Sequence, residues 1–139
     1  MSTLNSIPQN EVVSCYPVIQ QTVKDCAVAC IAMLFGRSYA EVFQAGGATV
    51  KAVRKLGAAE KALRRLAKGV GGTLIRRNEF DIEEDTGILW LGSTDPKNGG
   101  HSAMLFRGVL IDPGTGQLWN PEVFMQTHHY IPEALFELG

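Results

Sequence analysis

The segment 26–35 of the chain, CAVACIAMLF, carries no charged side chain at any position. We predict a helix here, with Asp25 as its N-cap and Gly36 as the residue that ends it. A helix that is apolar all round is buried all round, because no face of it is suited to water. The rest of the chain therefore has to cover this helix on every side.

The length and composition of the chain fit a single domain spanning residues 1–139. The chain has 139 residues, of which 45% are hydrophobic and 19% charged, and its formal net charge is −1. A chain of this length buries roughly two-thirds of the surface that its unfolded form exposes, which is enough for a sizeable core. The composition argues against disorder, and no apolar run approaches the ~20 residues of a membrane span.

The start of the sequence and the cysteine count bear on the cellular compartment. Residues 1–15, which we expect to form an irregular arm, lack the basic start and apolar stretch of a secretory signal. We therefore expect a cytoplasmic protein, with secretion by a route that needs no such signal left open. Three cysteines cannot all pair within the chain, and a reducing compartment keeps them as thiols.

Further helices are expected in the first half of the chain. A short helix is predicted at 38–45, where Ser38 and Glu41 have the spacing of a capping box. The segment 49–68 is predicted to form one helix, or two helices with a break at Gly57.

Strands are expected in the second half of the chain. Short strands are predicted at 73–77 and 88–92, and a longer apolar segment at 102–112 is interrupted only around Arg107 and Gly108. Helices first and strands later is the order of an α+β fold.

Cys26 is the candidate nucleophile because it begins the predicted apolar helix. Unpaired backbone N–H groups and the positive end of the helix dipole favour an anion at this position, and the thiolate is the nucleophilic form of cysteine. Cys30 lies one turn later on the same face and is expected in the core, whereas Cys15 receives no role.

We expect neither a metal nor a cofactor. Cys26, Cys30 and His101 would supply only three zinc ligands, and no second Cys or His pair stands at a recognisable spacing. The adjacent His128 and His129 would point in different directions on a strand or a helix, so we expect them to be structural or exposed.

His101 and Asp112 are candidates for a general base and the acid that orients it. A two-residue hairpin turn at Arg107 and Gly108 would pair Ala103 with Asp112 and place His101 diagonally from Asp112 on the same face. Such neighbours lie ~7–8 Å apart by their Cα atoms, within reach of a side-chain contact. A carboxylate there holds an imidazole in one tautomer and stabilises its cation.

Gln20 is a candidate oxyanion donor because it lies six residues before Cys26. A side-chain amide beside the backbone N–H of the nucleophile can bind a developing oxyanion, an effect worth ~2.7–4 kcal/mol per donor. The spacing alone does not choose between this role and a solvated side chain.

Three blocks of the sequence together resemble the C39 peptidase family. They are QQTVKDCAVACIAMLFG, GHSAMLFR and VLIDPGTG, at 20–36, 100–107 and 109–116. This family of papain-like cysteine proteases includes the leader-peptidase domains of bacteriocin and peptide exporters, which cut after a double-glycine motif. The residues that match its pattern in order are Gln20, Asp25, Cys26, His101, Asp112 and Pro113.

The resemblance implies a papain-like fold, with N-terminal helices and a buried nucleophile helix packed on a C-terminal antiparallel sheet. It also implies a peptidase that cleaves a peptide or protein substrate with a Cys26–His101–Asp112 triad and Gln20 as oxyanion donor. Ala27 stands where the family usually has glycine. The exporters continue into a membrane domain and an ATPase, which do not follow here, so we expect a stand-alone domain.

Two alternatives stay open. Nine of the thirteen Lys and Arg residues lie between Lys51 and Arg77, where Glu60 is the single acid, so a non-catalytic module could bind an acidic protein there. The apolar spacing within this segment favours a solvated helix face over a nucleic-acid interface, and Trp90 and Trp119 are expected in the core or a cleft wall. The second alternative is a thiol amidase or acyltransferase, acting as a secreted or phage effector.

Overall fold

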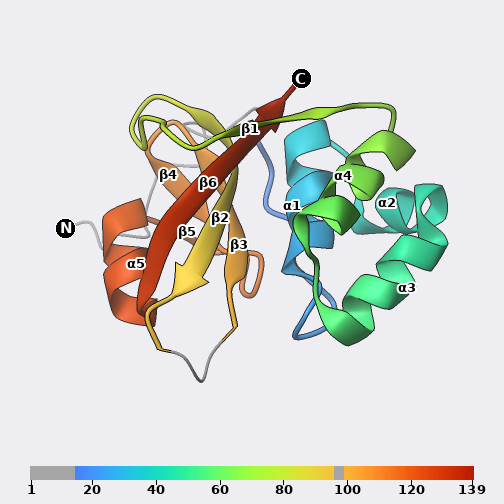
Figure 1. Ribbon diagram of the computed structural model, residues 1–139, viewed down its shortest axis with the longest axis horizontal. Coiled ribbons are helices and arrows are strands. Elements are labelled where there is room, and N and C mark those ends of the chain that lie inside the picture. Colours follow the sequence, from blue (N-terminus) through green and yellow to red (C-terminus); the bar gives the residue numbers. More distant parts are fainter. Residues whose placement is uncertain (1–14, 96–98) are drawn as a thin grey trace.

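The fold is α+β, with helices packed on an antiparallel sheet (Figure 1). It is seen in a computed structural model that describes residues 15–95 and 99–139. The expected arm at 1–15 therefore lies outside the described residues except for Cys15. The fold class predicted from the sequence is confirmed.

Four helices precede the sheet: α1 (Cys26–Phe35), α2 (Tyr39–Ala45), α3 (Gly47–Leu56) and α4 (Glu60–Gly69). Helix α1 is buried as predicted, since residues 27–33 are each no more than 3% exposed. Gly36 ends it in the left-handed conformation, with φ 64°. Asp25 is the N-cap residue, as predicted, although its side chain makes no capping hydrogen bond.

The predictions for the next helices also hold, with one shift of boundary. Ser38 and Glu41 form the capping box that starts α2. The segment predicted at 49–68 is two helices with a break at Gly57, and α3 already begins at Gly47. Within the described part of the chain, no single helix is long and apolar enough to cross a membrane; α1 and α2 would qualify only as a pair bent by 101°.

The strands are β1 (Leu74–Arg77), β2 (Thr86–Ser93), β3 (His101–Phe106), β4 (Val109–Ile111), β5 (Leu118–Trp119) and β6 (Tyr130–Leu138). They form a sheet in the order β1-β6-β2-β3-β4-β5, and every neighbouring pair is antiparallel. The last strand in sequence is therefore inserted between the first two.

Helix α5 (Pro121–His128) corrects the expectation that helices come first and strands later. It lies against the face of the sheet opposite α1–α4 (Figure 1). One apolar core fills the space between α1–α4 and the sheet, and a second lies under α5. The sheet is thus covered on both faces.

The β3–β4 hairpin has the predicted register. Met104 pairs with Ile111 and Phe106 with Val109, so the two-residue turn falls at Arg107 and Gly108. Both turn residues have positive φ, 44° and 85°, as a type I′ turn requires. This register places His101, at the start of β3, at the same end of the hairpin as Asp112, which follows β4.

Candidate active site

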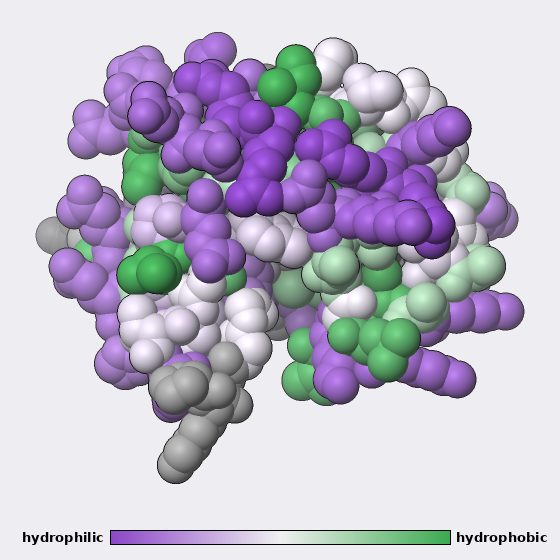
Figure 2. All heavy atoms as spheres, in the orientation of Figure 1, coloured by the Kyte–Doolittle hydropathy of each residue, from purple (hydrophilic) through white to green (hydrophobic). Residues whose placement is uncertain are grey.

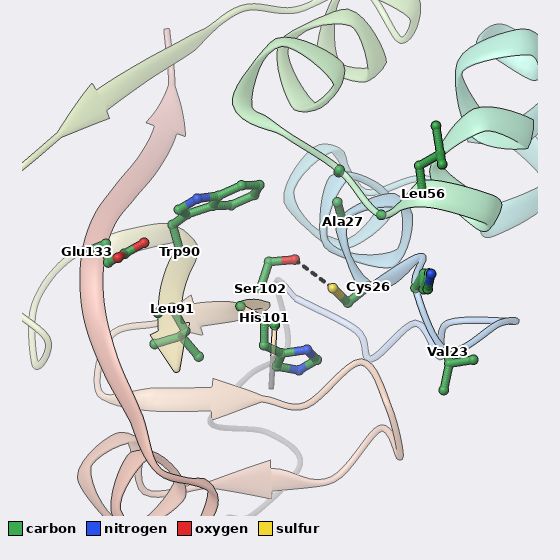
Figure 3. A pocket seen from close by; sticks show the side chains of 15 residues that line it. Val23, Cys26, Ala27, Leu56, Trp90, Leu91, His101, Ser102 and Glu133 are labelled. Atoms are coloured by element: carbon green, nitrogen blue, oxygen red, sulfur yellow. Dashed lines mark hydrogen bonds between the residues drawn. The ribbon is translucent and has the colours of Figure 1, made fainter. Parts of the chain in front are cut away.

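Cys26 lies at the start of α1, over the end of the sheet where β3 begins. The Ser102 hydroxyl donates a hydrogen bond to its sulfur, Oγ to Sγ, at 3.2 Å (Figure 3). Figure 3 shows His101 and Ser102 on neighbouring sides of the Cys26 sulfur. The first turn of a buried helix and the first two residues of β3 therefore converge on one thiol.

His101 and Asp112 are in contact, as the hairpin register predicts. The His101 Nε2 atom is 3.5 Å from Asp112 Oδ1, and the two side chains are only 17% and 13% exposed. The backbone N–H of Gly114 donates to Oδ1 at 3.0 Å and the Thr115 hydroxyl to Oδ2 at 3.2 Å, which fixes the carboxylate. Because Nε2 faces Asp112, the other imidazole nitrogen is left for Cys26.

The imidazole is also held by aromatic rings from the α5 side of the sheet. The His101 ring stacks on Tyr130 with centroids 5.5 Å apart and an interplanar angle of 14°, and lies 6.2 Å from the Phe124 ring. Sequence reasoning missed Ser102, Tyr130 and Phe124. The alternation of β3 was a signal for Ser102, since it directs residue 102 toward the helix that carries the nucleophile.

The charges of the site favour a thiolate–imidazolium pair. Burial raises the pKa of Cys26, but hydrogen bonding and charge from His101, together with hydrogen bonds from Ser102, lower it below its ordinary value overall. Burial opposes charge on His101, yet the hydrogen bonds to Asp112 and Cys26 raise its pKa to about 9. The pKa of Asp112 is lowered despite burial, mainly by its hydrogen bond with His101.

The other two thiols are buried, and for both of them burial has the largest effect on the pKa. Cys30 is fully buried, as predicted, and burial raises its pKa well above the ordinary value. Cys15 is 2% exposed, and burial raises its pKa to about 11. Cys26 is therefore the thiol whose environment favours the anion.

Gln20 lies close to this site but outside the residues that line the cleft. Its backbone N–H donates to the Pro113 carbonyl at 2.7 Å, which ties the segment before α1 to the turn after Asp112. Its side-chain Nε2 donates to the Thr22 carbonyl at 2.8 Å. The same nitrogen carries a second N–H, which is the donor that an oxyanion role requires; that role stays a prediction.

Asp25 organises the segment between Gln20 and the nucleophile. Its carboxylate is fully buried and accepts hydrogen bonds from the backbone N–H of Thr22 at 2.8 Å and from the hydroxyl of Tyr39. The Arg54 guanidinium lies 3.9 Å from the same carboxylate and also donates to the side chain of Gln21. This buried network connects α2 and α3 to the start of α1.

A cleft of about 700 Å³ opens beside Cys26, between the helices and the sheet. Its helical side carries the exposed side chains of Val23 and Leu56, which are 93% and 81% exposed. Trp90 and Gly100 line the sheet side. Figure 2 shows a hollow between the two halves of the molecule, with hydrophobic side chains gathered at the lower end of the helical half.

Residues 15–95 and 99–139 contain no group of three or more His, Cys, Asp or Glu side chains arranged to hold a metal ion.

His128 and His129 are exposed at the end of α5, and His128 contacts the Phe124 carbonyl through Nδ1 at 2.9 Å. Trp119 packs edge-on against Phe124. These residues have the structural or exposed positions that the sequence led us to expect.

The basic residues between Lys51 and Arg77 fall into two groups, those with an acidic partner and those without one. Arg64 and Arg76 pair with Glu60, while Arg77 pairs with Asp85, just before β2, and with Glu137 of β6. Five exposed basic side chains have no acidic partner among the described residues: Lys51, Lys55, Lys61, Arg65 and Lys68. A groove of about 510 Å³ between α3 and α4 lies among them.

No protein-family model matches the chain, and neither does any curated protein. A solved structure does: the peptidase domain of ComA from Streptococcus, a bi-functional ABC transporter involved in a quorum-sensing pathway. The TM-score is 0.58 at 17% sequence identity, and the match covers 89% of this chain and 97% of that domain. The chain therefore has a fold similar to that of the ComA peptidase domain.

Proposed function

We propose that the chain is a papain-like cysteine peptidase in which Cys26 is the nucleophile, His101 the acid and base, and Asp112 the residue that orients His101. One observation carries the proposal: a thiol with a lowered pKa sits at a helix start, beside an imidazole held by a carboxylate, and opens onto a cleft. The likeness in fold to a peptidase domain supports the same reaction class.

The proposed reaction uses the proton that the imidazolium already holds. The Cys26 thiolate attacks the carbonyl carbon of the scissile bond and forms a tetrahedral intermediate. As the C–N bond breaks, His101 gives its proton to the leaving amine, and a thioester on Cys26 remains. A water molecule then attacks the thioester while His101 accepts its proton; the thiolate leaves, the acid product is released and the resting pair is restored.

The oxyanion of the tetrahedral intermediate would be bound by the backbone N–H of Cys26 and by Gln20. The start of α1 leaves that backbone N–H without a partner inside the helix. Because Gln20 is tied to Pro113, the donor and the orienting acid belong to one connected segment. Loss of one such donor costs ~2.7–4 kcal/mol of transition-state stabilisation in other acyl-transfer enzymes.

The proposed substrate is a peptide cut after two small residues, and a double-glycine leader is the form suggested by the family resemblance. Ala27 lines the cleft directly beside Cys26, and Gly99 and Gly100 line it on the other side. A Cβ atom on Gly100 would lie 2.7 Å from the Leu91 carbonyl oxygen, so the chain approaches itself closely here. Glycine in the substrate would fit between these elements.

The proposal is tested by incubating the protein with peptides that carry Gly-Gly, Ala-Ala or Leu-Leu before the same sequence. We expect cleavage after Gly-Gly, weaker cleavage after Ala-Ala, and no cleavage by a Cys26→Ala variant. Adding an amine acceptor separates hydrolysis from acyl transfer, because transfer would yield an amide product instead of the free acid. Cleavage that persists in Cys26→Ala would refute the proposal.

A second candidate function, binding an acidic partner, is favoured by the groove between α3 and α4. Lys61 and Arg65 line this groove together with apolar residues. The candidate predicts salt-sensitive binding that charge reversal at Lys61 and Arg65 abolishes and Cys26→Ala leaves unchanged. An acidic peptide that binds equally well to the charge-reversed protein would exclude it.

A further inference from the structure

Apart from Cys26 and His101, the cleft has two charged side chains among its lining residues, one on each side. On the helical side, the Lys24 ammonium donates to the Lys55 carbonyl at 3.2 Å. On the sheet side, Glu133 has neither a hydrogen bond nor an ion pair to any part of the chain that the structure describes. A carboxylate that lines a cleft without a partner is available to a ligand.

A break in the strand register directs Glu133 to this cleft. Trp90 of β2 pairs with Ala134 of β6, but the next residue, Leu91, pairs with Pro132. Glu133 is therefore an extra residue with no opposite partner, as in a β-bulge. Bulges of this kind change the direction of a side chain and are frequent beside active sites.

Gly92 provides the space that the Glu133 carboxylate occupies. A Cβ atom built on Gly92 would lie 2.6 Å from Glu133 Oε2 and 2.8 Å from its Cδ. Any larger residue at position 92 would displace the carboxylate from this part of the cleft. The bulge and the glycine thus act together: one redirects the side chain and the other leaves room for it.

Trp90 lines the same cleft as Glu133. The indole is half-buried and is held by an edge-on contact with Phe136 at 5.6 Å between ring centroids. Figure 3 shows the Glu133 carboxylate extending toward Trp90. A carboxylate and an indole that line the same cleft suit a cation, because both the negative charge and the face of the ring attract it.

We propose that Glu133 and Trp90 form a subsite of the substrate cleft that binds a positively charged side chain, lysine or arginine, of the peptide being cleaved. This proposal rests on the proposed peptidase function and adds a substrate preference to it. The basic residue would stand at a fixed position relative to the scissile bond, because the subsite and Cys26 line the same cleft.

The test is a comparison of cleavage preferences in a mixed peptide library digested by the full chain and by three variants. Glu133→Gln removes the charge, Glu133→Lys reverses it, and Glu122→Lys makes the same reversal on the exposed surface of α5 as a matched control. We expect the parent chain and Glu122→Lys to enrich Lys or Arg at one position. The enrichment should be lost in Glu133→Gln, and Glu133→Lys should enrich Asp or Glu at that position.

Pairs of peptides that differ only at the enriched position give the size of the preference for a basic residue. A partly exposed ion pair is worth little, so kcat/KM for lysine over glutamine should be about fivefold in the parent chain and about one in Glu133→Gln. Equal rates for the glutamine peptide in both proteins would show that Glu133→Gln is folded and active. An identical preference in the parent chain and Glu133→Lys overturns the subsite alone, whereas absence of cleavage in all four proteins overturns the peptidase function and the subsite with it.

Discussion

Replacing Asp112 tests how the charge of the site is maintained. The Asp112→Asn variant keeps an oxygen that can accept from His101 Nε2 but removes the negative charge, whereas Asp112→Ala removes both. The pair therefore separates the orienting effect of the carboxylate from its electrostatic effect. The backbone N–H of Gly114 and the Thr115 hydroxyl remain to hold an asparagine in place.

The size of the effect of Asp112 on His101 follows from the distance between the two side chains and from the pKa of His101. At 3.5 Å and an effective dielectric constant of about 20, the attraction between the carboxylate and the imidazolium is about 5 kcal/mol before desolvation. The rise in the His101 pKa from 6.5 to about 9 corresponds to about 3 kcal/mol, shared between Asp112 and Cys26. We therefore expect the His101 pKa to fall toward 6.5 in both variants.

The assay is the rate of Cys26 alkylation by iodoacetamide as a function of pH, which needs no substrate. In the parent chain His101 stays protonated up to about pH 9, and its charge and hydrogen bond help to lower the pKa of Cys26 below the ordinary cysteine value. With the imidazolium lost at lower pH, alkylation at pH 7 should slow by about tenfold in Asp112→Ala and by less in Asp112→Asn. Identical pH profiles in the three proteins would refute the assignment of Asp112.

Three further predictions concern the same site. Ser102→Ala should raise the Cys26 pKa and slow alkylation at pH 6 by about threefold to tenfold, with Ser102→Thr restoring the rate; an unchanged rate would show that the hydroxyl contributes nothing. Asp25→Ala should lower the free energy of unfolding by about 3–5 kcal/mol in urea titrations, because Arg54 and the Thr22 N–H lose a buried partner; a loss below about 1 kcal/mol would contradict this. A plot of kcat/KM against pH should fall on the alkaline side near pH 9, where His101 loses the proton that the leaving amine needs, and a plateau to pH 10.5 would exclude His101 as the acid.

The elements that the sequence predicted well depend on local signals. The uniform apolar composition of 26–35 was sufficient for α1, and the turn at Arg107 and Gly108 was sufficient for the register of the β3–β4 hairpin. Helix α5 and strand β6 were missed. Strand β6 contains Pro132 and Glu133, which break the apolar alternation, and its place in the sheet depends on pairing with β1 and β2 far away in the chain.

The same distinction applies to the site. Cys26 followed from its position at a helix start, and the contact between His101 and Asp112 followed from the hairpin register. The stacking of Tyr130 on His101 and the redirection of Glu133 into the cleft depend on where β6 crosses the sheet. Such contacts are tertiary, so they cannot be predicted from the spacing of residues in the sequence.

The assignment of Cys26 as the reactive nucleophile underlies the whole proposed mechanism. It is tested by intact-mass and peptide mass spectrometry after brief iodoacetamide treatment at pH 7. We expect one adduct, on Cys26, with the buried Cys15 and Cys30 unmodified and with no adduct on a Cys26→Ser variant. Preferential labelling of Cys15 or Cys30 in the folded chain would contradict the assignment of Cys26 as the nucleophile.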